Sequence, residues 1–81
     1  MVEALLYRPG RTRLWFYRVE IAMNLFAEAS VIVEWGLSGG QPNRRVSCHG
    51  DLRAASHAAD RYRKRALRRG YARARGHGIP D

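Results

Sequence analysis

The stretch RLWFYRVEIAMNLFAEASVIVEW, residues 13–35, decides the fold of this chain. Its first half is dense in aromatic and β-branched residues, which favour β-strands. The odd-numbered positions of that half form one apolar row: Trp15, Tyr17, Val19 and Ile21. After Asn24 a second alternation supplies a matching row: Ala29, Val31, Val33 and Trp35. Two alternating strands joined by a short turn at Asn24 predict an antiparallel hairpin with one apolar and one solvent-facing side.

The flanking segments extend this hairpin. Residues 44–49 (RRVSCH) are typical of a shorter third strand, and residues 2–7 (VEALLY) of a short strand or an ordered arm. The Pro-Gly pair in residues 8–11 (RPGR) indicates a turn between that arm and the hairpin.

After Asp51 the apolar spacing changes to that of one face of an α-helix. The residues on this face are Leu52, Ala55, Ala59, Tyr62 and Ala66. Asp51 is a natural N-cap, and Gly70 followed by Tyr71 resembles a left-handed C-cap with its apolar contact. The predicted fold is therefore α+β: a small antiparallel sheet of three to four strands on 13–22, 28–36 and 44–49, crossed by one long helix from about 52 to 69.

A chain of 81 residues has the length of one domain. We divide it into an N-terminal strand or arm (1–12), a main domain (13–73) and a flexible C-terminal tail (74–81). No run of about 18 apolar residues suggests a membrane span, and no signal peptide is recognisable. The single Cys48 fits a reducing compartment, so we expect a cytoplasmic protein, with association with the nucleoid left open.

The formal net charge of +8 is unevenly placed. Four arginines and four glutamates cancel within residues 1–43, so the whole excess follows residue 43. Charge of one sign in one half of a small domain suggests a polyanionic partner, and the alternative is that charge keeps the protein soluble.

The densest cations lie between Arg61 and Arg75, eight in all. Cations in the last helical turn stabilise the helix dipole, and Asp60 with Lys64 could form an i,i+4 pair, but these effects account for only two or three of them. Arginine offers a planar pair of donors to phosphate. With Arg44 and Arg45 on the neighbouring strand, we expect a continuous phosphate-binding surface.

Catalysis is not expected. Cys48 and His49 are adjacent on a strand, so their side chains point to opposite faces and cannot pair as nucleophile and base. The histidines and the cysteine show no metal-ligand spacing. We expect no catalytic residues, no metal and no cofactor.

Several pieces of the chain resemble the bacterial WGR domain family, over about Arg13 to Tyr71. They are Phe16-Tyr17 leading to Glu20, Leu25-Phe26, Glu34-Trp35-Gly36, and the closing Gly70-Tyr71. The resemblance implies a small antiparallel sheet with one helix across it. In DNA-dependent poly(ADP-ribose) polymerases, such domains bind at DNA strand breaks, where the motif Trp lies against the sugar of the 5′ end.

Carried over, Trp35 and Gly36 match the first two motif positions, while Leu37 stands where the family has Arg. Alternation alone allows Trp35 to be a core residue, or a rim residue with one ring face packed and the other free for a sugar or base.

The leading hypothesis is a non-enzymatic module that binds DNA, with DNA ends as one form of it. The expected contacts are Trp35, Gly36, Arg44, Arg45, Arg61, Lys64, Arg65, Arg68 and Arg69. The alternatives are RNA as the polyanion, or a protein-interaction module whose basic face docks an acidic partner in trans. The sequence does not set the oligomeric state.

Overall fold

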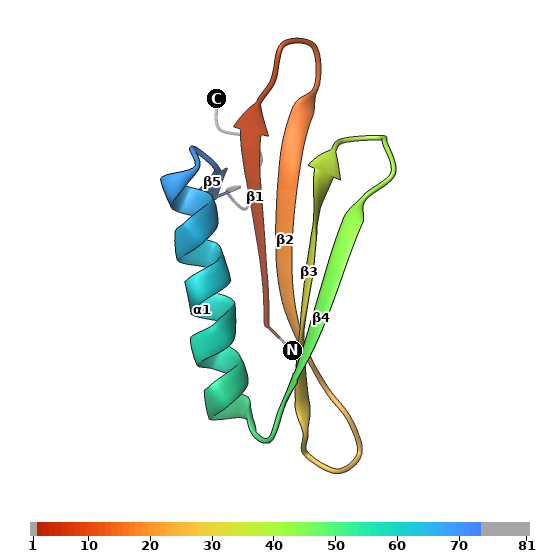
Figure 1. The fold of residues 1–81 in the computed structure, drawn as a ribbon, viewed down its shortest axis with the longest axis vertical. Helices are drawn as coiled ribbons and strands as arrows, with labels where there is room; N and C mark the ends of the chain where they lie inside the picture. Colours follow the sequence, from red (N-terminus) through yellow and green to blue (C-terminus); the bar gives the residue numbers. More distant parts are fainter. Residues whose placement is uncertain (1, 74–81) are drawn as a thin grey trace.

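The protein is described here by a computed structural model, which covers residues 2–73 and the side chains from Ala4 onward. The predicted tail, 74–81, lies outside the described residues. In chain order the elements are β1 (Val2–Pro9), β2 (Leu14–Met23), β3 (Ala29–Leu37), β4 (Asn43–His49), α1 (Leu52–Arg68) and β5 (Ala72–Arg73). The strands form one antiparallel sheet in the order β4-β3-β2-β1-β5, and α1 packs on one face of it (Figure 1). The predicted α+β class is confirmed.

The helix-facing side of the sheet is the predicted apolar side of the hairpin. In the β2–β3 register Tyr17 pairs with Trp35, and Val19 pairs with Val33. Val19 is 3% exposed and Val33 1%, because both lie beneath α1. Alternation therefore assigned the buried face of these two strands correctly.

The turn between β2 and β3 is held by one side chain. Asn24 Oδ1 accepts from the backbone N–H of Phe26 at 2.9 Å and of Glu28 at 3.0 Å, and its Nδ2 donates to Glu28 Oε1 at 2.9 Å. This confirms a turn at Asn24. It leaves Leu25 98% and Phe26 82% exposed at the tip.

Both ends of α1 are capped as predicted. Asp51 Oδ1 accepts from the Ala54 N–H at 2.8 Å. At the other end Gly70 has a left-handed φ of 94°, and the Tyr71 N–H donates back to the Ala66 carbonyl at 3.1 Å. This bond pattern places Tyr71, 7% exposed, back against the helix and the sheet.

The buried residues of α1 are all alanines: Ala55, Ala58 and Ala66. Small side chains let the helix approach the sheet closely, but they bury little apolar area.

The sheet has five strands, where the sequence predicted three to four. Residues 2–9 pair with β2 along their whole length, which makes them a strand. The fifth strand is only two residues long, and it forms because the turn at Gly70 brings Ala72 and Arg73 beside Tyr7 and Leu6 of β1. No helix within residues 2–73 has the length and apolar character that a bilayer crossing needs.

Candidate nucleic-acid interface

A basic groove runs between α1 and the edge strand β4. It consists of two adjoining pockets of about 200 Å³ each, which share Tyr62 and Arg65. The first is also lined by Tyr17, Val33, Trp35, Arg45 and Arg69. The second is also lined by Ser47, His49, Ala58 and Arg61. We call this the β4-side groove.

Strand and helix periodicity together build its walls. Arg45, Ser47 and His49 face α1 because each pairs with a helix-facing residue of β3. On the opposite wall Arg61, Arg65 and Arg69 are four residues apart along α1 and its cap, so they lie on one flank. Among residues 2–73, no acidic side chain lines either pocket. The groove therefore brings together four of the predicted arginines.

Trp35 lies half-buried at the β3 wall of this groove. Its ring stacks on Tyr17, with centroids 6.3 Å apart and an interplanar angle of 28°. Tyr17 in turn contacts the Tyr71 ring at 5.6 Å. Burial raises the pKa of the Tyr17 hydroxyl, and the Arg65 guanidinium offsets part of this rise, so Tyr17 is a neutral phenol at neutral pH. Trp35 is thus packed against Tyr17 on one side, and it also lines the β4-side groove.

Arg8 extends this row of rings and fixes the end of the helix. Its guanidinium lies 4.9 Å from the Tyr71 ring centroid and 5.5 Å from that of Trp15. Its Nη1 also donates to the Arg69 carbonyl at 3.1 Å. Arg8 therefore holds the backbone that carries Arg69. Sequence reasoning missed it, because the two arginines are 61 residues apart in the chain.

A scan against models of protein families matches the WGR domain over residues 6–78. The chain belongs to the WGR domain family. WGR domains are nucleic-acid-binding modules in poly(ADP-ribose) polymerases. Searches of curated proteins and of solved structures returned no match.

Not every predicted contact of this WGR domain reaches the β4-side groove. The sequence analysis places Arg44 and Arg45 on one continuous surface, but the structure puts them on opposite faces of the sheet. Adjacent strand residues point to opposite faces, so Arg44 lies on the open face, with its Nε 3.9 Å from Glu34 Oε2. Glu34 is also paired with Arg18.

Two helix cations and the motif glycine also lie outside the groove. Lys64 is on the outer side of α1, with its Nζ 3.2 Å from Asp60 Oδ2, and Arg68 is exposed without lining either pocket. Gly36 is buried, and a side chain there would meet the backbone of Gln41 and Pro42 at 3.5 Å. These are ordinary van der Waals distances, so the feature that favours glycine here is its φ of 154°, a conformation that other residues rarely adopt.

Leu37, at the third WGR motif position, ends strand β3. It pairs with Trp15 in the β2–β3 register and is half-buried. Because residues two apart on a strand share a face, Leu37 lies on the same side as Trp35.

Cys48 and His49 of this WGR domain lie on opposite faces of the sheet, as the alternation predicts. Cys48 Sγ lies 3.8 Å from Ser30 Oγ on the open face, while His49 Nε2 lies 3.0 Å from Ser47 Oγ on the helix side. Residues 2–73 contain no cluster of three or more metal-ligating side chains.

Charge is also divided along the molecule, whose longest extent is 43 Å. Figure 1 shows the β1–β2 turn, the β3–β4 turn and the end of α1 at one end of the fold. That end carries a group of arginines: Arg8, Arg11, Arg13, Arg44, Arg45, Arg68, Arg69 and Arg73. At the other end lie the β2–β3 turn with Glu28 and the start of α1 with Asp51 and Arg53.

Proposed function

We propose that this WGR domain is a non-enzymatic DNA-binding module and that the β4-side groove is its main contact. The observation that carries the proposal is the convergence of Arg45, Arg61, Arg65 and Arg69 on one groove with Trp35 on its wall. Arginine guanidinium groups bind phosphate oxygens in pairs, so four of them on facing walls suit a linear polyanion.

The spacing of the groove residues supports the proposal. Positions four apart on a helix are about 6 Å apart along its axis. Positions two apart on a strand are about 6.6 Å apart. Each wall therefore presents polar or cationic groups at regular short intervals, as a repeating phosphate backbone requires.

Trp35 gives the groove a flat apolar element beside these cations. An aromatic ring that is packed on one side can accept a sugar or an unstacked base on the other. This agrees with the role of the motif Trp in the WGR domains of the polymerases, and it makes an exposed DNA end the preferred ligand.

The test is a binding series at 50 and 200 mM salt with linear duplex bearing 5′-phosphates, closed circular duplex, single-stranded DNA and RNA. If about four phosphates are neutralised, log K should fall with log salt at a slope of about −3.6. Arg61→Ala with Arg65→Ala should flatten that slope by about two. A salt-independent affinity in the unmodified protein would contradict the proposal.

The matched control is Arg11→Ala with Arg13→Ala. Both residues are exposed in the β1–β2 turn and line none of the pockets described above. This variant loses the same formal charge, so it gives the size of the general electrostatic effect. The loss at Arg61 and Arg65 should exceed it clearly.

A protein-interaction role is the second candidate, and the exposed Leu25 and Phe26 favour it. In that case the cations would dock an acidic protein surface and the apolar tip would add a contact. A poly-glutamate chain is the discriminating competitor. If it displaces DNA at an equal concentration of charges, the groove selects charge alone, and the protein-interaction role is preferred.

A further inference from the structure

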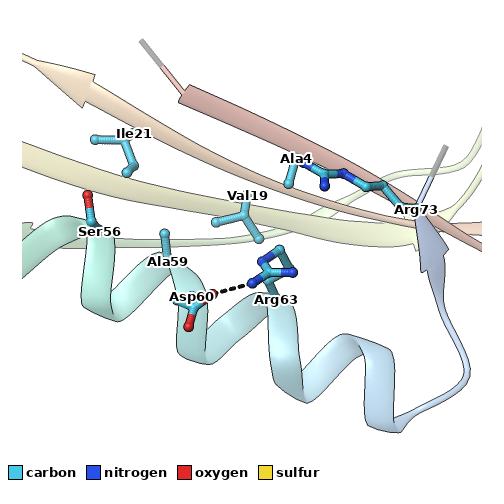
Figure 2. Close-up of a pocket in the computed structure, with 8 residues that line it drawn as sticks. All are labelled: Ala4, Val19, Ile21, Ser56, Ala59, Asp60, Arg63 and Arg73. Carbon is cyan, nitrogen blue, oxygen red and sulfur yellow. Dashed lines mark hydrogen bonds and ion pairs between the residues drawn. The ribbon is translucent and has the colours of Figure 1, made fainter. Parts of the chain in front are cut away.

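A second basic groove lies on the opposite side of α1, toward β1. This pocket has a volume of about 170 Å³. Figure 2 shows Val19 and Ile21 of the sheet facing Ala59 of the helix across it. Arg63 from α1 and Arg73 from β5 line it, together with Asp60, which is ion-paired with Arg63. We call it the β1-side groove. Arginines therefore lie along both sides of the helix. They come from α1 itself, from β4 and from β5.

The outer ridge of α1 between the two grooves is cationic as well. It carries Lys64, whose side chain is 62% exposed, and Arg68. Asp60 is the one acidic residue between Leu52 and Arg68, and it is paired with both Arg63 and Lys64. The second half of the helix therefore carries cations on both flanks and on its outer ridge.

The width of an α-helix has a geometric match in duplex DNA. An α-helix with its side chains is about 10–12 Å across. The major groove of B-DNA is about 12 Å wide and about 8.5 Å deep, whereas the minor groove is only about 6 Å wide. A helix that stands out from its sheet can enter the first and not the second.

We propose that α1 lies in the major groove of duplex DNA, with the β4-side groove against the phosphates of one strand and Arg63 and Arg73 against those of the other. This rests on the proposed function and adds to it the docking geometry. It requires both flanks of the helix to contribute to binding on closed circular duplex, where no end is present.

The first test removes a charge from the helix face. Asp60→Asn should release Arg63 and Lys64 from their ion pairs and tighten binding to closed circular duplex about three- to tenfold. Glu28→Gln is the matched control, since it makes the same change in net charge in the β2–β3 turn and its amide oxygen can still accept from Asn24. Equal gains in the two variants would contradict the proposal.

The second test compares the flanks. Arg63→Gln with Arg73→Gln should weaken binding to circular duplex about as much as Arg61→Gln with Arg65→Gln, and at least fivefold more than Arg11→Gln with Arg13→Gln. Circular dichroism should show the same helix content in all three variants. If the Arg63 and Arg73 variant behaves like the turn control, the β1-side groove does not touch DNA and the proposal fails.

The third test occupies one DNA groove at a time. Duplex whose cytosines carry a bulky glucosylated 5-hydroxymethyl group has a filled major groove and should bind at least tenfold more weakly. Netropsin, which fills the minor groove of A·T tracts, should change the affinity less than twofold. The reverse pattern, or no effect of either, would overturn the major-groove docking while leaving DNA binding intact. Absence of binding to any unmodified duplex would instead overturn the proposed function.

Discussion

Trp35 is the residue where stability and recognition meet. Its ring packs on Tyr17, and the Tyr17 ring lies tilted against that of Tyr71, just beyond the end of the helix. The effect of a substitution at Trp35 therefore has to be measured twice, once on the stability of the fold and once on the affinity for DNA.

Trp35→Phe keeps most of the apolar volume, so we expect the domain to lose about 1–2 kcal/mol of stability and keep its fold. If the free side of the ring supports a terminal sugar, binding to linear duplex should weaken more than binding to closed circular duplex. Thermal melts and titrations of both ligands give the two numbers. Equal losses on the two DNAs would make Trp35 a packing residue only.

Leu37 occupies a strand position beside Trp35, so an arginine there would extend from the same face. Leu37→Arg should strengthen binding to 5′-phosphorylated ends by about 1–2 kcal/mol, the scale of one charge-assisted contact. Closed circular duplex should gain less. Leu37→Lys is the control, because it adds the same charge without a planar guanidinium group. Equal gains in affinity from both variants on both ligands would show a general charge effect.

Arg8 combines two ring contacts with a hydrogen bond to the Arg69 carbonyl. Arg8→Lys keeps the charge but loses the planar group that makes these contacts together, at an expected cost of about 1 kcal/mol. The melting temperature should fall by about 4–8 °C. Arg11→Lys, in the exposed turn, should leave it unchanged; an equal fall there would show that the Arg8 contacts add nothing.

At the scale of elements, α1 depends on its ends because its buried face is made of alanines. Gly70→Ala places a side chain at a left-handed residue, 3.4 Å from Arg8 Cδ. We expect a loss of about 1–2 kcal/mol, measured by thermal or urea unfolding.

Gly50→Ala is the control at the other end of the helix. A Cβ there meets nothing within 4 Å. Its unfolding free energy should stay close to that of the unmodified domain. A Gly70→Ala variant as stable as Gly50→Ala would show that the left-handed cap is not needed.

The elements were predictable from the sequence wherever the signal is local. Alternation assigned Val19 and Val33 to the buried face, and Asp51 and Gly70 marked the ends of the helix. The same alternation separates Arg44 from Arg45, and applying it there would have removed Arg44 from the groove. It could not have found Arg8 or β5, because both depend on segments that meet only in the folded chain.

Within the candidate site, four of the predicted arginines and Trp35 do converge, since helix and strand periods fix their faces. The sequence did not reveal that Arg63 and Arg73 lie together in the β1-side groove, apart from the other arginines of the cluster. Sequence spacing does not show where β5 returns to the sheet. The division of the chain at residues 13 and 74 stays a prediction, as do the cytoplasmic location and the absence of catalysis.

At the scale of the whole molecule, a group of arginines gathers at one end of the long axis, while Glu28, Asp51 and, within residues 2–73, a single arginine, Arg53, lie at the other. In the field of a polyanion such a molecule experiences a torque as well as an attraction. It should turn its arginine-rich end toward DNA before contact. A larger fraction of encounters then has the orientation that binding needs, which raises the association rate constant.

This orientation has a kinetic signature. Removing Arg11 and Arg13, which lie at the arginine-rich end but outside both grooves, should lower the association rate constant and leave the dissociation rate constant nearly unchanged. Removing Arg61 and Arg65 should mainly speed dissociation. Stopped-flow or surface-based kinetics at two salt concentrations would separate the two effects, and faster dissociation of the Arg11 and Arg13 variant would count against steering. The uneven charge distribution would then orient the domain while it is still diffusing freely, before any contact with DNA is made.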